Sequence, residues 1–314
     1  MAYRDLQQES DIDEDIRLHI EAEFQRYANG ARILLNARPD AVTGLVSLAD
    51  GLFIYASTVV RFLVRDKHYA VEIYDKLLQS QGSKGSHQLY ERLDTLYTTI
   101  LDNAFGMFKI DRKRLKYIHQ VLTWFALNLD APLSGEDLQF IGIPIHITMD
   151  VIDRLRSVFI VEYIVTTTTC MVPCHASFPQ FLIDGERCQD SAYLVNSRSG
   201  NAMIAASLFK LLTSNTLPKG ADGDLPHIWK SADGKWMFHV LRAKYTYELA
   251  YLLRIFVESH LEAWLRGVEP WQHHGHISKL HVVSTLAATQ DWCKRHRLGD
   301  DLVARLGQIV DQNV

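Results

Sequence analysis

Cys170, Cys174, His175 and Cys188 are the residues whose types come closest to a metal-binding set. Zinc takes four deprotonated ligands, commonly thiolates and imidazoles, in a tetrahedral arrangement. The spacing here is C-x3-C-H-x12-C, which matches no standard zinc motif, and two of the cysteines flank Pro173 at the end of a predicted strand. We therefore expect small buried thiols rather than a metal site.

A second group of candidate ligands is the histidine cluster His273, His274, His276 and His281, which surrounds Gly275. Its composition predicts a polar loop between helices. Adventitious binding of transition metals is the only metal chemistry that such a loop suggests.

Ser177, His175 and Asp184 have the residue types of a hydrolase triad. The histidine and the serine are two residues apart, however, and no G-x-S-x-G elbow surrounds the serine. The pattern does not favour a hydrolase.

A phosphate-binding loop of the Walker A kind needs glycines, a lysine and a Ser or Thr at fixed spacing between a strand and a helix. The segments 82–85 and 233–235 contain glycine and lysine without that spacing. We predict that the chain is not an enzyme and that no cofactor binds to this chain alone.

The elements that hold these residues are expected to be mainly helical. Apolar residues recur at steps of three and four between Val42 and Leu63 and predict one buried helix over 41–66. The same periodicity predicts further helices at 69–79, 88–108, 134–141, 147–157, 177–183, 191–213, 236–265, 277–296 and 299–312, and another that starts near Asp111. Loops are expected at 80–86 and 217–226.

The only strong strand signal lies in the β-branched runs 158–161 and 164–172. Three helices and then a β-hairpin is the order of a winged-helix domain. Ser134 and Asp137 resemble a capping box at the start of the second of these helices. The predicted fold is mainly α, with a helical domain, a winged-helix domain with a small β-hairpin, and a second helical domain.

The predicted division of the chain is an N-terminal helical segment at 1–40, a helical domain at 41–110, a winged-helix-like domain at 111–190 and a C-terminal helical domain at 191–314. The 314 residues include 47% hydrophobic residues and carry a net charge of -4. The sequence has no apolar run of membrane-spanning length, so we expect no membrane partner. With four cysteines and no signal-peptide pattern, the expected location is the cytoplasm.

A winged helix can also bind DNA through its third helix, and a nucleic-acid-binding regulator is the alternative function. Asp150 and Asp153 lie near the exposed face of that helix, where Arg154 and Arg156 only offset them. Phosphate would be repelled by these carboxylates, so we do not expect nucleic acid to be the main partner.

Four co-linear segments resemble a known family. They are ADGLFIYASTVVRFL at 49–63, LDTLYTTIL at 93–101, HASFPQFLID at 175–184 followed by Arg187 and Cys188, and AYLLRIFVESHL at 250–261. They resemble the region downstream of the nucleotide-binding core in fungal NACHT proteins, which are NLR-like members of the STAND class of signalling NTPases. The resemblance covers about residues 12–265.

The resemblance implies a non-catalytic regulatory region that packs on a nucleotide-binding core, in cis or in trans, and relays its state. ADP or ATP would bind only through a P-loop domain that this sequence lacks. The chain would then be a fragment, a split gene product or a truncated paralogue, and an oligomer is possible.

The resemblance also implies cofactor-contacting residues, effective only with that core present. His175 matches a histidine that reaches the ADP β-phosphate, and Gly51 and Phe53 match a turn and helix start near the adenine. Phe53 replaces a proline of many relatives, and Pro179 and Gln180 replace a charged pair. Two alternatives stay open: His175 caps the helix that starts at Ser177, and Phe53 belongs to the core.

Overall fold

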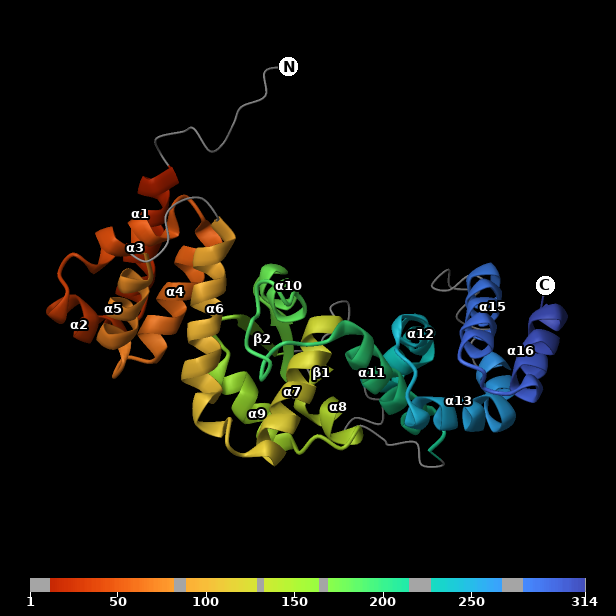
Figure 1. Cartoon of the computed structure of the whole chain (residues 1–314). Coiled ribbons are helices and arrows are strands. Elements are labelled where there is room, and N and C mark those ends of the chain that lie inside the picture. The colour runs from red at the N-terminus through yellow and green to blue at the C-terminus, as the bar shows by residue number, and fades with distance from the viewer. Residues whose placement is uncertain are drawn as a thin grey trace, which may run out of the picture. The chain divides into compact units, whose positions relative to one another are not determined.

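A computed structural model describes residues 12–81, 89–128, 133–163, 169–214, 227–266 and 279–313. The described chain is mainly α, as predicted, with one small sheet (Figure 1). It divides into two compact units. The first unit comprises Met1–Leu115, Asp150–Val161 and Pro173–Leu194, and the second comprises Lys116–Met149, Glu162–Val172 and Val195–Val314.

The first unit opens with helices packed around α4. Their bounds are α1 Ile12–Arg26, α2 Ala28–Ala37, α3 Ala41–Ala49, α4 Phe53–Arg65, α5 Ala70–Gln81 and α6 Leu89–Phe105, followed by the 3-10 turn η2 Gly106–Phe108. Helix α4 is central because both of its sides are apolar, and Ala56, Val59 and Val60 are wholly inaccessible to solvent. The predicted N-terminal helical segment corresponds to α1 and α2.

The prediction of one helix over 41–66 was wrong, because α3 and α4 are separate helices. Asp50 and Gly51 adopt positive φ angles of 48° and 76°, which end α3 and turn the chain before α4. Glycine reaches this left-handed conformation without steric cost, and aspartate is one of the few other residues that tolerate it. The hydrophobic periodicity continues across the turn and therefore concealed it.

The middle of the chain has three helices followed by two strands, which is the predicted order. The bounds are α7 Arg112–Leu127, β1 Leu133–Ser134, α8 Gly135–Phe140, α9 Ile145–Arg154, β2 Phe159–Tyr163, β3 Thr169–Pro173 and α10 Ser177–Ile183. The predicted capping box at α8 is confirmed, since Ser134 and Asp137 each accept the backbone N–H of the other. The two-residue strand β1 was not predicted. It pairs antiparallel with β3, and the strand order in the sheet is β1–β3–β2.

The second unit ends in helices α11 Ser197–Leu212, α12 His227–Arg242, α13 Tyr247–Ser259, α15 Lys279–Arg295 and α16 Asp300–Asn313. Their core is aromatic: the ring of Trp236 lies 5.3 Å from that of Phe209, 5.2 Å from that of Phe256 and 5.6 Å from that of Trp264. Such contacts favour close packing of the helices that carry the rings.

The prediction of one helix over 236–265 was also wrong. The chain leaves the helix after Arg242, and α13 starts beyond Thr246, whose hydroxyl accepts the backbone N–H of Leu249. A threonine cap of this kind satisfies a backbone donor that a new helix leaves unpaired. The loops predicted at 80–86 and 217–226 fall largely outside the described residues. In the part of the chain that is described, no helix is long and apolar enough to cross a membrane.

Candidate functional site

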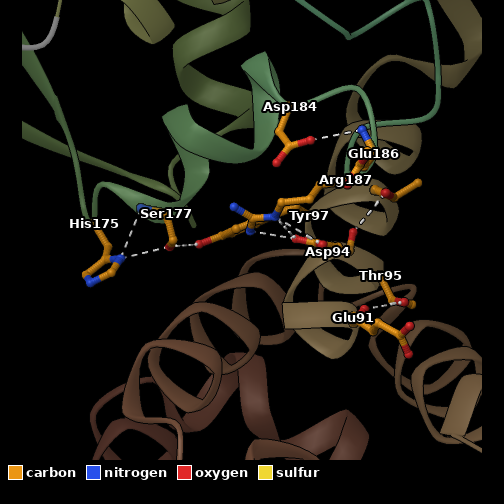
Figure 2. A network of polar contacts seen from close by, with 10 residues as sticks. Glu91, Asp94, Thr95, Tyr97, His175, Ser177, Asp184, Glu186 and Arg187 are labelled. Atoms are coloured by element: carbon orange, nitrogen blue, oxygen red, sulfur yellow. Dashed lines mark hydrogen bonds and ion pairs between the residues drawn. The ribbon is translucent and has the colours of Figure 1, made fainter. Parts of the chain in front are cut away.

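His175 lies between β3 and α10, and its side chain is exposed. Its Nδ1 accepts the backbone N–H of Ser177 at 3.1 Å and lies 2.8 Å from the Ser177 hydroxyl oxygen. The backbone bond confirms the alternative that His175 caps the start of α10. Figure 2 shows that the ring is held from this one side.

The Ser177 side chain connects His175 to α6. Its hydroxyl oxygen lies 2.7 Å from the hydroxyl oxygen of Tyr97, and both side chains are buried. The Tyr97 ring contacts Phe178 and Phe181 of α10, with centroids 5.1 and 5.4 Å apart. Burial raises the pKa of Tyr97 to about 12, so its hydroxyl keeps its proton at neutral pH.

An ion pair joins α6 to the turn after α10. Arg187 donates through Nε to both carboxylate oxygens of Asp94, at 3.0 and 3.1 Å, and through a terminal nitrogen at 2.7 Å (Figure 2). Both side chains are mostly shielded from solvent, and the guanidinium also lies 5.2 Å from the ring of Tyr90. Two segments that carry the resemblance, 93–101 and 175–188, are therefore held together by a bidentate pair and by the Tyr97–Ser177 bond.

Gly51 and Phe53 occupy the turn and the helix start between α3 and α4. The expectation that Phe53 belongs to the core was wrong, because 45% of the residue is exposed and its ring lies 6.1 Å from that of His19. In the described chain, no hydrogen bond or ring contact joins either residue to His175. The structure thus does not unite the three expected cofactor-contacting residues in one contact network.

The residues considered for a hydrolase do not form a triad. His175 and Ser177 are in contact, but Asp184 accepts the backbone N–H of Glu186 at 2.9 Å instead of approaching the histidine. The Ser177 hydroxyl is buried against Tyr97, where a substrate carbonyl has no access.

The described residues contain no group of three or more histidine, cysteine or acidic side chains that could hold a metal ion. Cys174 instead accepts a hydrogen bond from Arg61 at 2.9 Å. Cys188 is buried, and burial raises its pKa to about 11, which disfavours the thiolate that zinc requires. The side chains of Cys170, His273, His274 and His276 lie outside the described residues.

The acidic residues of α9 are joined to the basic residues around them. Asp150 accepts from Arg114 at 2.8 Å and from Arg154 at 2.9 Å. Asp153 pairs with Arg65 at 2.8 Å and with Arg156. Cations that are paired in this way offer little charge to a nucleic-acid backbone, so the geometry does not favour the nucleic-acid alternative.

Comparisons with protein-family models, with curated proteins and with solved structures found no match. The support for a functional site here therefore comes from the contacts described above. Sequence reasoning singled out His175 but gave no role to Tyr97, Asp94 or Arg187, although all three lie in or beside the resembling segments. The only signal for them was that their segments occur in the same order as in the family. Nothing in the sequence specified which side chains would meet.

Proposed function

We propose that the chain is a non-catalytic regulatory region of a NACHT-type signalling protein, which packs against a nucleotide-binding core and responds to its nucleotide. The core would be supplied in cis or in trans and would hold ADP or ATP. The chain's own part is to contribute His175 to the phosphate side of that nucleotide. The setting we propose is the cytoplasm, in keeping with the free thiols of Cys174, Cys188 and Cys293.

The observation that carries this proposal is the way His175 is mounted. The Nδ1 side of the ring is bonded to Ser177 at the start of α10, while the residue as a whole is exposed. An imidazole can donate a hydrogen bond to an anion, and a phosphate is the strong acceptor that a nucleotide offers. Among the described residues, His175 thus has one bonded nitrogen, Nδ1, and no partner for Nε2, which can serve a ligand.

A second argument comes from the support behind His175. Arg187 and Asp94 clamp the turn after α10 to α6, and the Tyr97–Ser177 bond holds the start of α10 to the same helix. A group that must meet a ligand benefits from being held in place beforehand, because less freedom is lost on binding. The Asp94–Arg187 pair provides this support for the exposed histidine.

The test uses the full chain and a separately expressed P-loop domain of a NACHT protein. We expect a complex that elutes earlier than either component in size-exclusion chromatography when ADP is present, and a weaker complex for His175→Ala. His68→Ala is the matched control, since His68 is also an exposed histidine of the first unit. If no complex forms with ADP, or if both variants bind alike, the proposal is wrong.

A further inference from the structure

Ser177 links Tyr97 to His175 by hydrogen bonds, and the direction of these bonds follows from one donor, the backbone N–H of Ser177. A backbone N–H can only donate, so the bond from Ser177 N to His175 Nδ1 requires that Nδ1 carries no proton. The Ser177 hydroxyl, 2.8 Å from the same nitrogen, must then be a donor as well. Its oxygen is left to accept from the Tyr97 hydroxyl at 2.7 Å. Tyr97 is therefore the donor to Ser177, and Ser177 is the donor to His175. Figure 2 shows these three side chains linked in this order.

We propose that Tyr97 is a positioning residue that acts through the Ser177 hydroxyl to hold the ring of His175 in place and to reinforce the tautomer set by the Ser177 backbone N–H, the neutral form with its proton on Nε2. In that tautomer the outward nitrogen is a donor, and it suits a ligand that accepts hydrogen bonds, such as a phosphate oxygen. The ligand class rests on the proposed function. The orientation of the ring by Tyr97 does not, since it follows from the contacts within the first unit.

Burial protects the hydrogen bonds between Tyr97, Ser177 and His175 from competition by water. Tyr97 is 1% exposed and Ser177 is 4% exposed, so water has little access to replace either partner. The Tyr97 ring also packs against Phe178 and Phe181, and this packing holds its hydroxyl next to Ser177. With Tyr97 donating to its oxygen, the Ser177 hydroxyl is kept in the rotamer that donates to His175. Polar groups linked in this way in a poorly solvated interior strengthen one another.

The first experiment is an NMR measurement on the full chain with 15N-labelled histidine, at about pH 8, where histidines are generally neutral. The chain has 14 histidines, and the signals that disappear in His175→Ala identify those of His175. We expect the Nδ1 signal to be that of an unprotonated, hydrogen-bonded nitrogen and the Nε2 signal that of a protonated one. Tyr97→Phe should shift the Nδ1 signal toward that of a more weakly bonded nitrogen.

The matched control is Tyr193→Phe. Tyr193 is another buried tyrosine of the first unit, and its hydroxyl donates to Asp102 at 3.2 Å. Its loss should leave the His175 signals unchanged. Should Tyr97→Phe fail to fold, Ser177→Ala removes the same link while keeping the Tyr97 ring, and it should shift the Nδ1 signal. A protonated Nδ1 in the wild type would overturn the proposal, as would a folded Tyr97→Phe or Ser177→Ala variant whose signals match those of the wild type.

The second experiment is a double-mutant cycle on binding of the ADP-loaded P-loop domain. Tyr97→Phe should weaken binding about fivefold in the wild-type background, as expected for one hydrogen bond, and should have no effect in a His175→Ala background. An equal loss in both backgrounds would mean a general structural role and would overturn the positioning role. Failure of the wild type to bind at all would remove the proposed function, and the NMR measurement would still decide the role of Tyr97.

Discussion

Tyr97 and Ser177 are 80 residues apart in the sequence, yet their hydroxyl oxygens lie 2.7 Å from each other in the interior of the first unit. This bond ties α6 to the start of α10, the short helix that begins beside His175. The phenol and the hydroxyl each have a second role, since one packs against aromatic rings and the other faces the imidazole. A single contact thus links the packing of the unit to the residue that we expect to meet a ligand.

Loss of the Tyr97 hydroxyl should destabilise the first unit measurably. We expect Tyr97→Phe to lower the free energy of unfolding by about 1 kcal/mol, because one buried hydrogen bond is lost while the ring stays in place. Chemical denaturation followed by circular dichroism measures the change. Tyr69→Phe is the control, as Tyr69 is 59% exposed and should show almost no effect. Equal stability of Tyr97→Phe and the wild type would contradict the expectation.

Breaking the Asp94–Arg187 pair should cost more than losing that hydrogen bond. Asp94→Ala leaves the guanidinium of Arg187 largely shielded from water and without its carboxylate, and we expect a loss of about 2 kcal/mol in the free energy of unfolding. Thermal and chemical denaturation both report it. The control is Glu248→Ala, which removes the partner of Lys210 in an exposed ion pair.

The Lys210–Glu248 pair is a suitable control because its two side chains are 56% and 60% exposed. Exposed pairs contribute between about 0 and 1 kcal/mol, since solvent screens them. If Asp94→Ala and Glu248→Ala had similar effects, the pair between α6 and the turn after α10 would not be the stabilising contact that its geometry indicates.

Local signals in the sequence predicted several elements well. The range predicted for α10 matches the observed helix, and the capping box of Ser134 and Asp137 is present as expected, because both depend on residues a few positions apart. The two helix breaks were missed for a physical reason. Apolar residues recur at helical spacing on both sides of Asp50–Gly51 and of the segment 243–246, and periodicity alone cannot register the change of direction between them.

Of the residues in the contact network around α10, the sequence singled out His175, whereas the turn at Gly51 shares no contact with it in the described chain. His175 lies exposed beside α10, and only its alternative role as a cap of that helix is confirmed. Its partners depend on which helix packs against α10, and sequence periodicity indicates only that a face is buried, not what it meets. Phe53 illustrates the same limit, since an apolar type predicted burial and the fold left it at the exposed start of α4.

Close packing between α2 and α4 should make Gly30 intolerant of a side chain. A Cβ atom at this position would overlap the backbone carbonyl oxygen of Val64, which cannot move without displacing α4. We expect Gly30→Ala to lower the free energy of unfolding by about 1–3 kcal/mol, the usual cost of overpacking. Gly106→Ala is the control, because nothing lies within 4 Å of the added carbon there. A Gly30→Ala protein as stable as the wild type would show that the two helices can separate freely.

His239 should make the second unit sensitive to acid. The side chain is 1% exposed, and burial lowers its pKa to about 3, with Lys235 and Arg242 acting in the same direction. Its neutral form is held by Asn201, whose amide donates to the Ser197 carbonyl and so turns its own oxygen toward His239 Nδ1, 2.8 Å away. His239 is thus the donor in this bond, and its tautomer is the opposite of the one deduced for His175.

Because the folded pKa of His239 lies below the unfolded value of about 6.5, the unfolded chain binds the extra proton between these two values. The stabilisation is therefore complete above about pH 6.5 and declines as the pH falls toward 3, by at most about 1.4 kcal/mol per pH unit. His239→Gln keeps a donor for Asn201 and cannot titrate. The stability of the wild type relative to this variant, measured by urea denaturation between about pH 7 and pH 4, should decrease as the pH is lowered. A difference that stays constant with pH would mean that His239 does not remain neutral in the fold.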